Sequence, residues 1–284
     1  MTTEEMIKFV HLHNHSCYSL LDGLSRIDEM VERARSMNME AIALTDHGNM
    51  FGAFEFYSSC KEKKIKPIIG CELYLVEDRH RKKFTREEHD LRHHLLVLAK
   101  NQTGFKNLIK IVSTGFMEGY YAGYPRIDKE IIEKYREGLI VTSGCPASIV
   151  NYYLKMDKQE EAIKELKWFK DVFGEDFYIE LQEHLIENLD GTGKSQHFLN
   201  SWLLKWAKNN NIPFIITNDA HYVKKEHATF HDIMLCIKTN SRLKEEKGKG
   251  KGKRFGFQTE EFYIKSPTEI AQAFRGRMDE ADIR

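Results

Sequence analysis

Short apolar, β-branched runs recur along the chain, and the segments between them carry apolar residues at helical spacing. The runs occupy residues 9–13, 41–45, 67–76, 94–99, 139–143, 177–181 and 213–217. Helical periodicity covers residues 26–37, 52–64, 105–114, 158–173 and 196–209. Runs that are apolar throughout are typical of strands buried on both faces, and their alternation with helices predicts a parallel sheet. We therefore expect an α/β fold; such a sheet, closed into a barrel, places functional groups at the C-terminal ends of its strands.

Residues that commonly bind metals lie in or just beyond six of these seven runs. In chain order they are His11, His13, His15, Asp22, Asp46, His47, Glu72, His94, Cys145, Asp219 and His221. Alternation along a strand places His11, His13 and His15 on one face, where three buried imidazoles are costly without partners. Each motif alone is a weak indication, because a lone pair of histidines or a buried Cys is more often structural. Their recurrence at strand ends favours a shared metal site.

The donor types indicate the metals and the chemistry. Imidazole and carboxylate suit Zn, Mn or Fe, and the thiolate of Cys145 favours Zn or Fe. The two oxygens of Glu72 can bridge two cations, and cations about 3.5–4 Å apart activate a shared water and clamp phosphate oxygens. The chain contains no Ser-His-Asp arrangement, P-loop or GxGxxG motif that would compete for the chemistry. The sequence therefore predicts a polynuclear centre that hydrolyses phosphoesters.

Length, charge and cysteine content indicate the size of the domain, its electrostatic character and its cellular compartment. A chain of 284 residues fits a single barrel domain, and equal numbers of Lys+Arg and Asp+Glu, 43 each, mean that any phosphate partner must be attracted by local charge. No apolar run approaches the length of a membrane span, and five scattered cysteines favour a reducing compartment, so we expect a cytoplasmic protein without membrane contact.

Residues 77–93 are densely charged and predict a solvated excursion between two strands. Residues 244–253 predict a flexible basic loop, with a phosphate-tracking patch as the alternative.

Several segments together resemble the PHP (polymerase and histidinol phosphatase) family. They are HLHNHSCYSLLDG (11–23), ALTDHGNMFGAFEFY (43–57), KPIIGCELYL (66–75), HHLLVLAKNQTGFKNLIKIVS (93–113), SGCPAS (143–148), TNDAHYV (217–223), YPRID (124–128) and FYIKSPTEI (262–270). The ordered set covers essentially the whole chain. It is most similar to the PHP domains at the N-terminus of bacterial replicative DNA polymerase alpha subunits.

The resemblance implies a distorted seven-stranded β/α barrel, residues 1–284, with three divalent metal ions (Zn, Mn or Fe) in its C-terminal mouth. His13, His15, Glu72 and Asp219 would hold the first metal. Glu72 would bridge to the second, which His94 and Cys145 also bind, and Asp22, His47 and His221 would hold the third. His11 stands where many members carry Asp, so we expect a flanking role, and Asp46 is expected to orient His47 from behind. Arg126 and His184 are candidates for contacting phosphate, with a structural role as the alternative.

The implied activity is a metal-dependent 3′–5′ exonuclease of the proofreading type, with Glu72, Asp219 and His13 central to the chemistry. This sequence retains all nine ligands, which some polymerase alpha subunits have lost. The implied partners are a DNA 3′ end, other replicase subunits and polymerase domains. The chain has no palm, fingers or thumb segment, and residues 255–284 are expected to extend toward that polymerase region.

Two alternatives to the exonuclease stay open. In the first, the domain is a non-catalytic, metal-stabilised scaffold that braces the polymerase and docks a separate exonuclease; retention of all nine ligands counts against it. In the second, it is a small-molecule phosphatase of the histidinol-phosphate type, against which the polymerase-like segments 43–57 and 262–270 count.

Overall fold

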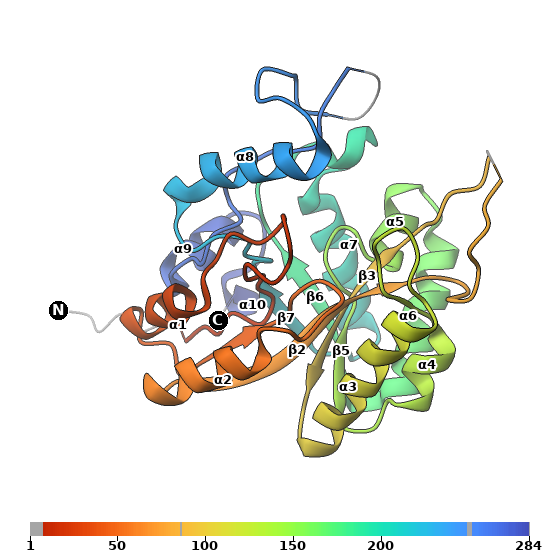
Figure 1. Ribbon diagram of the computed structural model, residues 1–284, viewed down its shortest axis with the longest axis horizontal. Helices are drawn as coiled ribbons and strands as arrows, with labels where there is room; N and C mark the ends of the chain where they lie inside the picture. The colour runs from red at the N-terminus through yellow and green to blue at the C-terminus, as the bar shows by residue number, and fades with distance from the viewer. Residues whose placement is uncertain (1–7, 86, 249–251, 284) are drawn as a thin grey trace.

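The computed structural model describes residues 8–85, 87–248 and 252–283, and a seven-stranded sheet forms the framework of this part of the chain (Figure 1). Its strands are β1 (Ala41–Leu44), β2 (Lys66–Leu75), β3 (His93–Ala99), β4 (Arg126–Ile127), β5 (Leu139–Thr142), β6 (Phe177–Gln182) and β7 (Phe214–Thr217). They lie in the order β1-β2-β3-β5-β6-β7, and the short β4 pairs with β2.

The sheet is mixed, which corrects the expectation of a parallel sheet. β1 and β2, β5 and β6, and β6 and β7 pair in parallel, but β3 runs antiparallel to both β2 and β5. The physical reason lies in the connection between β2 and β3. A parallel return requires a crossover, usually a helix, whereas the described residues of 76–92 form no helix and bring the chain straight back.

The first apolar run, residues 9–13, does not form a regular strand, but the segment around it hydrogen-bonds to β1 on one side and to Ala220, just beyond β7, on the other. Ala43 N–H donates to the His11 carbonyl (2.8 Å), and Ala220 N–H donates to the His13 carbonyl (3.1 Å). The ladder is interrupted because Asn14 N–H donates to the Thr45 hydroxyl (2.8 Å) in place of a carbonyl. The expected distorted seven-stranded barrel of the PHP type is confirmed in architecture, with β4 as the seventh strand.

Helices surround this sheet (Figure 1). The five helices expected from periodicity are confirmed as α1 (Ile27–Ser36), α2 (Ala53–Glu62), α3 (Gln102–Met117), α6 (Gln159–Phe173) and α7 (Gln196–Asn209). The additional ones are α4 (Lys129–Lys134), α5 (Ile149–Lys155), α8 (Ala228–Thr239), α9 (Pro267–Phe274) and α10 (Glu280–Ile283). None of the helices in the described part of the chain combines the length and apolar character that crossing a membrane requires.

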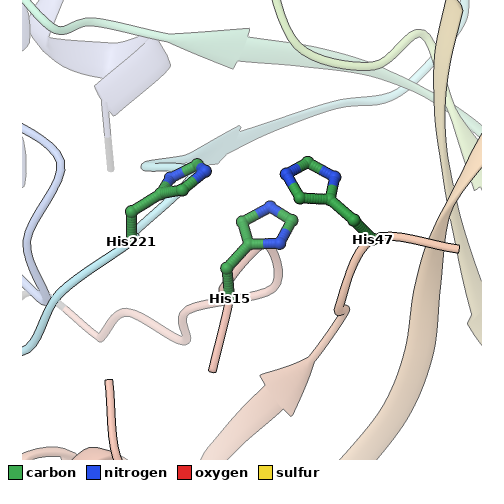
Figure 2. Close-up of side chains that lie close together, drawn as sticks. All are labelled: His15, His47 and His221. Carbon is green, nitrogen blue, oxygen red and sulfur yellow. The ribbon is translucent and has the colours of Figure 1, made fainter. Parts of the chain in front are cut away.

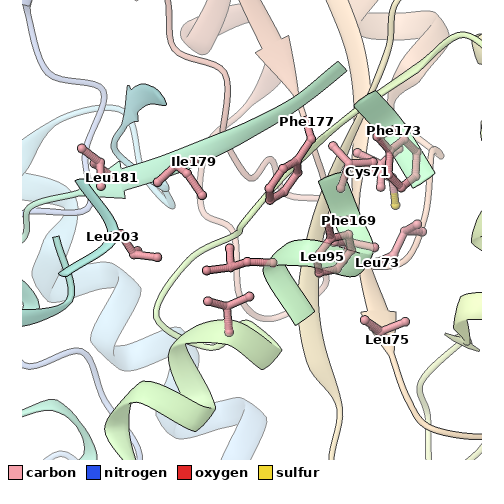
Figure 3. Packing of buried hydrophobic residues seen from close by; sticks show 14 of the residues in the cluster. Cys71, Leu73, Leu75, Leu95, Phe169, Phe173, Phe177, Ile179, Leu181 and Leu203 are labelled. Atoms are coloured by element: carbon pink, nitrogen blue, oxygen red, sulfur yellow. The ribbon is translucent and has the colours of Figure 1, made fainter. Parts of the chain in front are cut away.

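Strand alternation separates a packing face from a polar face. On β2, Leu73 and Leu75 join the main core with Phe169 of α6 and Leu203 of α7 (Figure 3). Glu72, which lies between the core residues Cys71 and Leu73 along the strand, points to the opposite side of the sheet. β6 repeats the pattern, because Phe177, Ile179 and Leu181 belong to the same core while the residues between them are polar. The interior face of the sheet is therefore free to carry charged groups.

The C-terminal segment packs against the domain. Tyr263 forms a bridge with Tyr222, and Ile264, Ile270 and Phe274 are buried. A capping box between Ser266 and Glu269 starts α9. Of the expected basic loop 244–253, residues 249–251 lie outside the described residues.

Candidate metal centre

Glu72 lies at the middle of the candidate centre, on the interior face of β2. Its Oε1 atom is 3.1 Å from His13 Nε2, 3.1 Å from His94 Nδ1 and 3.3 Å from Cys145 Sγ. The three partners come from the N-terminal segment, the start of β3 and the loop after β5, so the barrel fold brings distant parts of the chain to one carboxylate oxygen.

The second oxygen of Glu72 faces a different set of imidazoles. Oε2 is 2.8 Å from His47 Nδ1 and 3.4 Å from His15 Nε2. Figure 2 shows the rings of His15, His47 and His221 close together, and each offers a nitrogen within 4.8 Å of the others. A carboxylate whose two oxygens face separate groups of ligands is placed as a bridging ligand must be.

Asp219 supplies a second carboxylate just after β7. Its Oδ1 is 3.1 Å from His15 Nε2 and 3.4 Å from His13 Nε2. Its backbone adopts a left-handed conformation (φ 45°), which Asp tolerates better than most residues and which often marks a functional site. Asp22 completes the group, because its Oδ2 is 3.3 Å from His47 Nε2.

All nine expected ligands thus come together, although their groupings differ in detail from the expected sets. His13, His15 and Asp219 form one triad, as expected for the first metal. His47 joins Glu72 and His94 in a second triad, beside Cys145, whose Sγ is 3.5 Å from His94 Nδ1. The third triad is the histidine group of Figure 2, so His15 takes the place of Asp22 in it.

Hydrogen bonds from behind fix which nitrogen of His13 and His15 faces the centre. His13 Nδ1–H donates to Glu180 Oε1 (2.7 Å). The lone pair of Nε2 then faces the centre, where it can bind a metal. The Ser19 hydroxyl donates to Asp46 Oδ1 (2.7 Å), so it accepts from His15 Nδ1–H (3.0 Å), and again Nε2 points inward. Both imidazoles are therefore held in the tautomer that a metal ligand requires.

The inward atoms are buried and lack hydrogen-bond partners among the described residues. They are His13 Nε2, His15 Nε2, Asp22 Oδ1, His47 Nδ1, Glu72 Oε2 and Asp219 Oδ1. Buried polar atoms are rarely left unpaired, because each costs about 1–3 kcal/mol. All of these atoms except Asp22 Oδ1 lie within contact distance of other candidate ligands, and divalent cations would supply their missing partners.

The electrostatics of the centre are dominated by its carboxylates. Burial opposes a charge on His47, but Glu72 and Asp22 outweigh burial and raise the pKa of His47 to about 10. Burial raises the pKa of the Cys145 thiol well above its ordinary range, and Glu72 and Asp219 raise it further. Strong negative potential attracts cations, and a bound cation reverses this effect and favours the thiolate and neutral imidazole that act as ligands.

Neither candidate for phosphate contact is available at the centre, which corrects that expectation. Arg126 is fully buried and donates to the carbonyls of Gly119, Arg79 and Arg81 and to Asp90, so its role is structural. His184 is also fully buried; its Nε2–H donates to the Asn218 carbonyl (2.6 Å), and its Nδ1 accepts from Gln196 (3.0 Å).

Two further residues, His11 and Asp46, were expected to lie beside the ligands and not among them. His11 is buried, and its Nε2 is 2.8 Å from the Lys265 carbonyl, outside the nine-residue cluster. Asp46 does not hydrogen-bond the His47 ring. It reaches His47 through Ser19, whose hydroxyl accepts from the His47 backbone N–H (3.0 Å).

Sequence reasoning missed Glu180 and Ser19. Glu180 is buried in β6 and accepts from Thr142 and Thr217 as well as from His13. The available indication was an acidic residue inside an otherwise apolar strand, where an unpaired carboxylate would be very costly. Ser19 carried no comparable indication.

The chain matches a known protein family and is similar to several known proteins. The family model described as PHP domain matches residues 11–184, which include seven of the nine candidate ligands but not Asp219 and His221. The chain is 44% identical to the DNA polymerase III subunit alpha of Borreliella burgdorferi over 270 residues, 42% to that of Treponema pallidum over 272, and 38% to that of Deinococcus radiodurans over 275. These matches cover 94% of this chain and 22%, 22% and 19% of the respective relatives, so the chain spans about a fifth of their length.

Proposed function

The chain belongs to the PHP domain family, and we propose that it is the metal-dependent phosphoesterase domain of a replicative DNA polymerase alpha subunit, acting as a 3′–5′ exonuclease. The substrate is then a DNA 3′ end, and the partners are polymerase domains and other replicase subunits of the cytoplasm. The observation that carries the proposal is Glu72, whose two oxygens face separate groups of ligands.

The residues would divide among three cations as follows. His13, His15, Glu72 and Asp219 would hold the first; Glu72, His94 and Cys145 would hold the second; and Asp22, His47 and His221 would hold the third. This division follows the resemblance to the family, whereas the triads described above place His47 beside Glu72 and His94 and place His15 beside His221. When bound, such ions lower the pKa of water and neutralise the charge that develops on a phosphoryl group under attack. The mixture of imidazole, carboxylate and thiolate suits Zn, Mn or Fe.

The protein's own contribution is positioning. Glu180 and Ser19 hold the imidazoles of His13 and His15 with Nε2 inward, so no reorganisation is needed when metals bind. Burial of Glu72, His13 and His15 excludes bulk water and strengthens every charge interaction in the centre. The most exposed ligand side chains are His94 (24%) and Asp22 (14%), so the substrate approaches on their side.

The test is hydrolysis by protein stripped with EDTA and then supplied with Mn²⁺ or Zn²⁺. We expect metal-dependent shortening from the 3′ end of labelled single-stranded DNA and of a primer with a 3′ mismatch. Asp219→Asn should abolish shortening, whereas Asp176→Asn, a surface carboxylate paired with Lys100, should not.

The two open alternatives give different results. Hydrolysis of neither DNA nor thymidine 5′-(4-nitrophenyl phosphate) by metal-replete protein, with a large drop in melting temperature on chelation, would identify a scaffold and overturn the exonuclease proposal. Turnover of small phosphomonoesters without turnover of DNA would identify a small-molecule phosphatase.

A further inference from the structure

A column of contacting aromatic side chains leads outward from the candidate centre next to His94, its most exposed candidate ligand. The Tyr74 ring lies 5.7 Å from the His94 ring and 5.9 Å from the His47 ring, measured between centroids. Tyr124 meets Tyr74 edge to face at 5.0 Å, and the Arg92 guanidinium lies 3.7 Å from the centre of the Tyr124 ring. The metal centre and Arg92 are thus connected by two aromatic rings.

The fold explains why this column stands at the opening. Tyr74 and Glu72 are two positions apart on β2 and so share its interior face, and Tyr74 pairs in register with His94. Arg92 directly precedes β3, the strand that begins with His93 and His94. Arg92 is therefore held near the centre, because the strand that directly follows it carries the candidate ligand His94.

The hydrogen-bonding capacity of Arg92 is unused. Among the described residues its guanidinium makes no hydrogen bond; its ion-pair contact, with Asp90 Oδ2, is 3.5 Å long. The other oxygen of Asp90 is 2.7 Å from Arg126 Nη1, so one carboxylate is shared by two guanidinium groups and a positive charge is left over. The Arg92 side chain is 28% exposed, so solvent and ligands reach it.

Two other candidate cations, Lys238 and Arg126, are not available to a substrate. Lys238 Nζ is 2.8 Å from Asp22 Oδ2, and Arg126 is fully buried. Arg92 differs because stacking on Tyr124 fixes the plane of the guanidinium but leaves its N–H edge free, which is the geometry that binds phosphate oxygens in pairs.

We infer that Arg92, held in place by the Tyr74–Tyr124 pair, binds the phosphate of the nucleotide that precedes the scissile bond of a single-stranded nucleic acid. This inference rests on the proposed function, because it requires a nucleic-acid end to enter the centre. Arg92 then favours polynucleotides over small phosphodiesters, and it takes the phosphate-contacting role that the sequence had suggested for Arg126.

The test compares Arg92→Ala with Arg81→Ala. Arg81 lies in the same excursion, residues 77–93, and also lies over an aromatic ring, Phe84. It differs from Arg92 because it pairs with Glu88 and not with the Tyr74–Tyr124 pair. Binding of the full chain to a fluorescent, 3′-blocked oligothymidylate is measured by anisotropy over a range of salt concentrations. Hydrolysis is measured with an unblocked oligothymidylate and with thymidine 5′-(4-nitrophenyl phosphate), which lacks the preceding phosphate.

For Arg92→Ala we expect about tenfold weaker binding, as for loss of a charged hydrogen bond. The slope of log Kd against log salt should become shallower by about 0.7, the value for one single-strand phosphate contact. The loss in kcat/KM should be about tenfold larger for the oligonucleotide than for the small diester. Arg92→Lys, which keeps the charge, should retain the wild-type salt slope, and Arg81→Ala should behave as wild type.

Two results overturn the inference: wild-type affinity and salt slope in Arg92→Ala, or an equal loss in Arg81→Ala. Either result leaves the proposed function standing if the small diester is hydrolysed. Absence of all hydrolysis refutes the proposed function, while the binding measurements still decide the role of Arg92. A melting temperature for each variant separates loss of the phosphate contact from loss of folding.

Discussion

Replacing Glu180 by Gln removes one negative charge from behind His13 while it keeps the shape of the side chain. Glu180 Oε1 accepts from His13 Nδ1–H, from the Gln182 amide and from Thr217, and an amide oxygen in the same place accepts all three. The change therefore removes the carboxylate charge that acts on His13 Nε2 and keeps all contacts of Oε1. Its one other effect is at Oε2, where an amide N–H group would face the Thr142 hydroxyl that now donates there.

The expected magnitude follows from the contact. A carboxylate hydrogen-bonded to a metal-binding imidazole raises its basicity, and loss of such a partner typically lowers metal affinity by about 10- to 100-fold. This corresponds to about 1.4 to 2.7 kcal/mol of binding free energy. The 2.7 Å length of the contact and complete burial of both side chains favour the upper part of that range.

The assay is competition for Zn²⁺ or Mn²⁺ between the protein and a chromophoric chelator. The matched control is Glu183→Gln, a buried carboxylate three residues along the chain that accepts from Leu185 N–H and lies 3.7 Å from Arg277 instead of contacting a ligand. We expect Glu183→Gln to bind metal within about twofold of wild type, since its side chain is not coupled to the centre. Unchanged affinity in Glu180→Gln, or an equal loss in Glu183→Gln, would refute the argument.

Two further predictions concern stability. Gly48 has φ +63°, and an added Cβ would lie 2.8 Å from Pro125 Cγ and 3.0 Å from Tyr74 Cε2, whereas Gly123, at φ +90°, has open space. In urea unfolding, Gly48→Ala should therefore cost about 1–3 kcal/mol more than Gly123→Ala, and equal costs would contradict the packing argument. Burial lowers the pKa of His184 from 6.5 to about 4, so the unfolded chain binds the extra proton and stability should fall as pH drops from 6.5 toward 4, by up to about 3 kcal/mol. In urea titrations across this range, the free energy of unfolding of His184→Gln should depend less steeply on pH than that of wild type. An equal slope would show that a group other than His184 causes the pH dependence.

The candidate ligands could be placed near one another from the sequence because strand geometry is local, whereas their division among three metals came from the resemblance to the PHP family. Glu72 lies in a strand whose neighbours Cys71 and Leu73 are apolar and packed against helices, so alternation alone directs it to the other face. Asp219 and His221 directly follow β7, and His47 follows β1, so the ends of parallel strands gather them at one edge.

Strand direction and the supporting contacts depend on partners that are distant in the chain. His13 and Glu180 are 167 positions apart, and nothing local to either one identifies the other. The reversal of β3 follows from the connection after β2, in which the residues that the structure describes form no helix. The charged pattern of residues 77–93 predicted a solvated excursion, but it did not specify in which direction the chain would return.

Arg126 and Arg92 show which part of the phosphate contact the sequence could not predict. In the sequence both are arginines beside family motifs, and Arg126, within YPRID, is the more conspicuous. Three backbone carbonyls, from Gly119, Arg79 and Arg81, accept hydrogen bonds from the buried Arg126. Two of them belong to the excursion, whose described residues before β3 form neither helix nor strand. Arg92 stays available because its carboxylate neighbour Asp90 is already engaged by Arg126. Which arginine is left to contact a substrate is thus decided by a competition for one carboxylate, and only the folded arrangement of the excursion settles that competition.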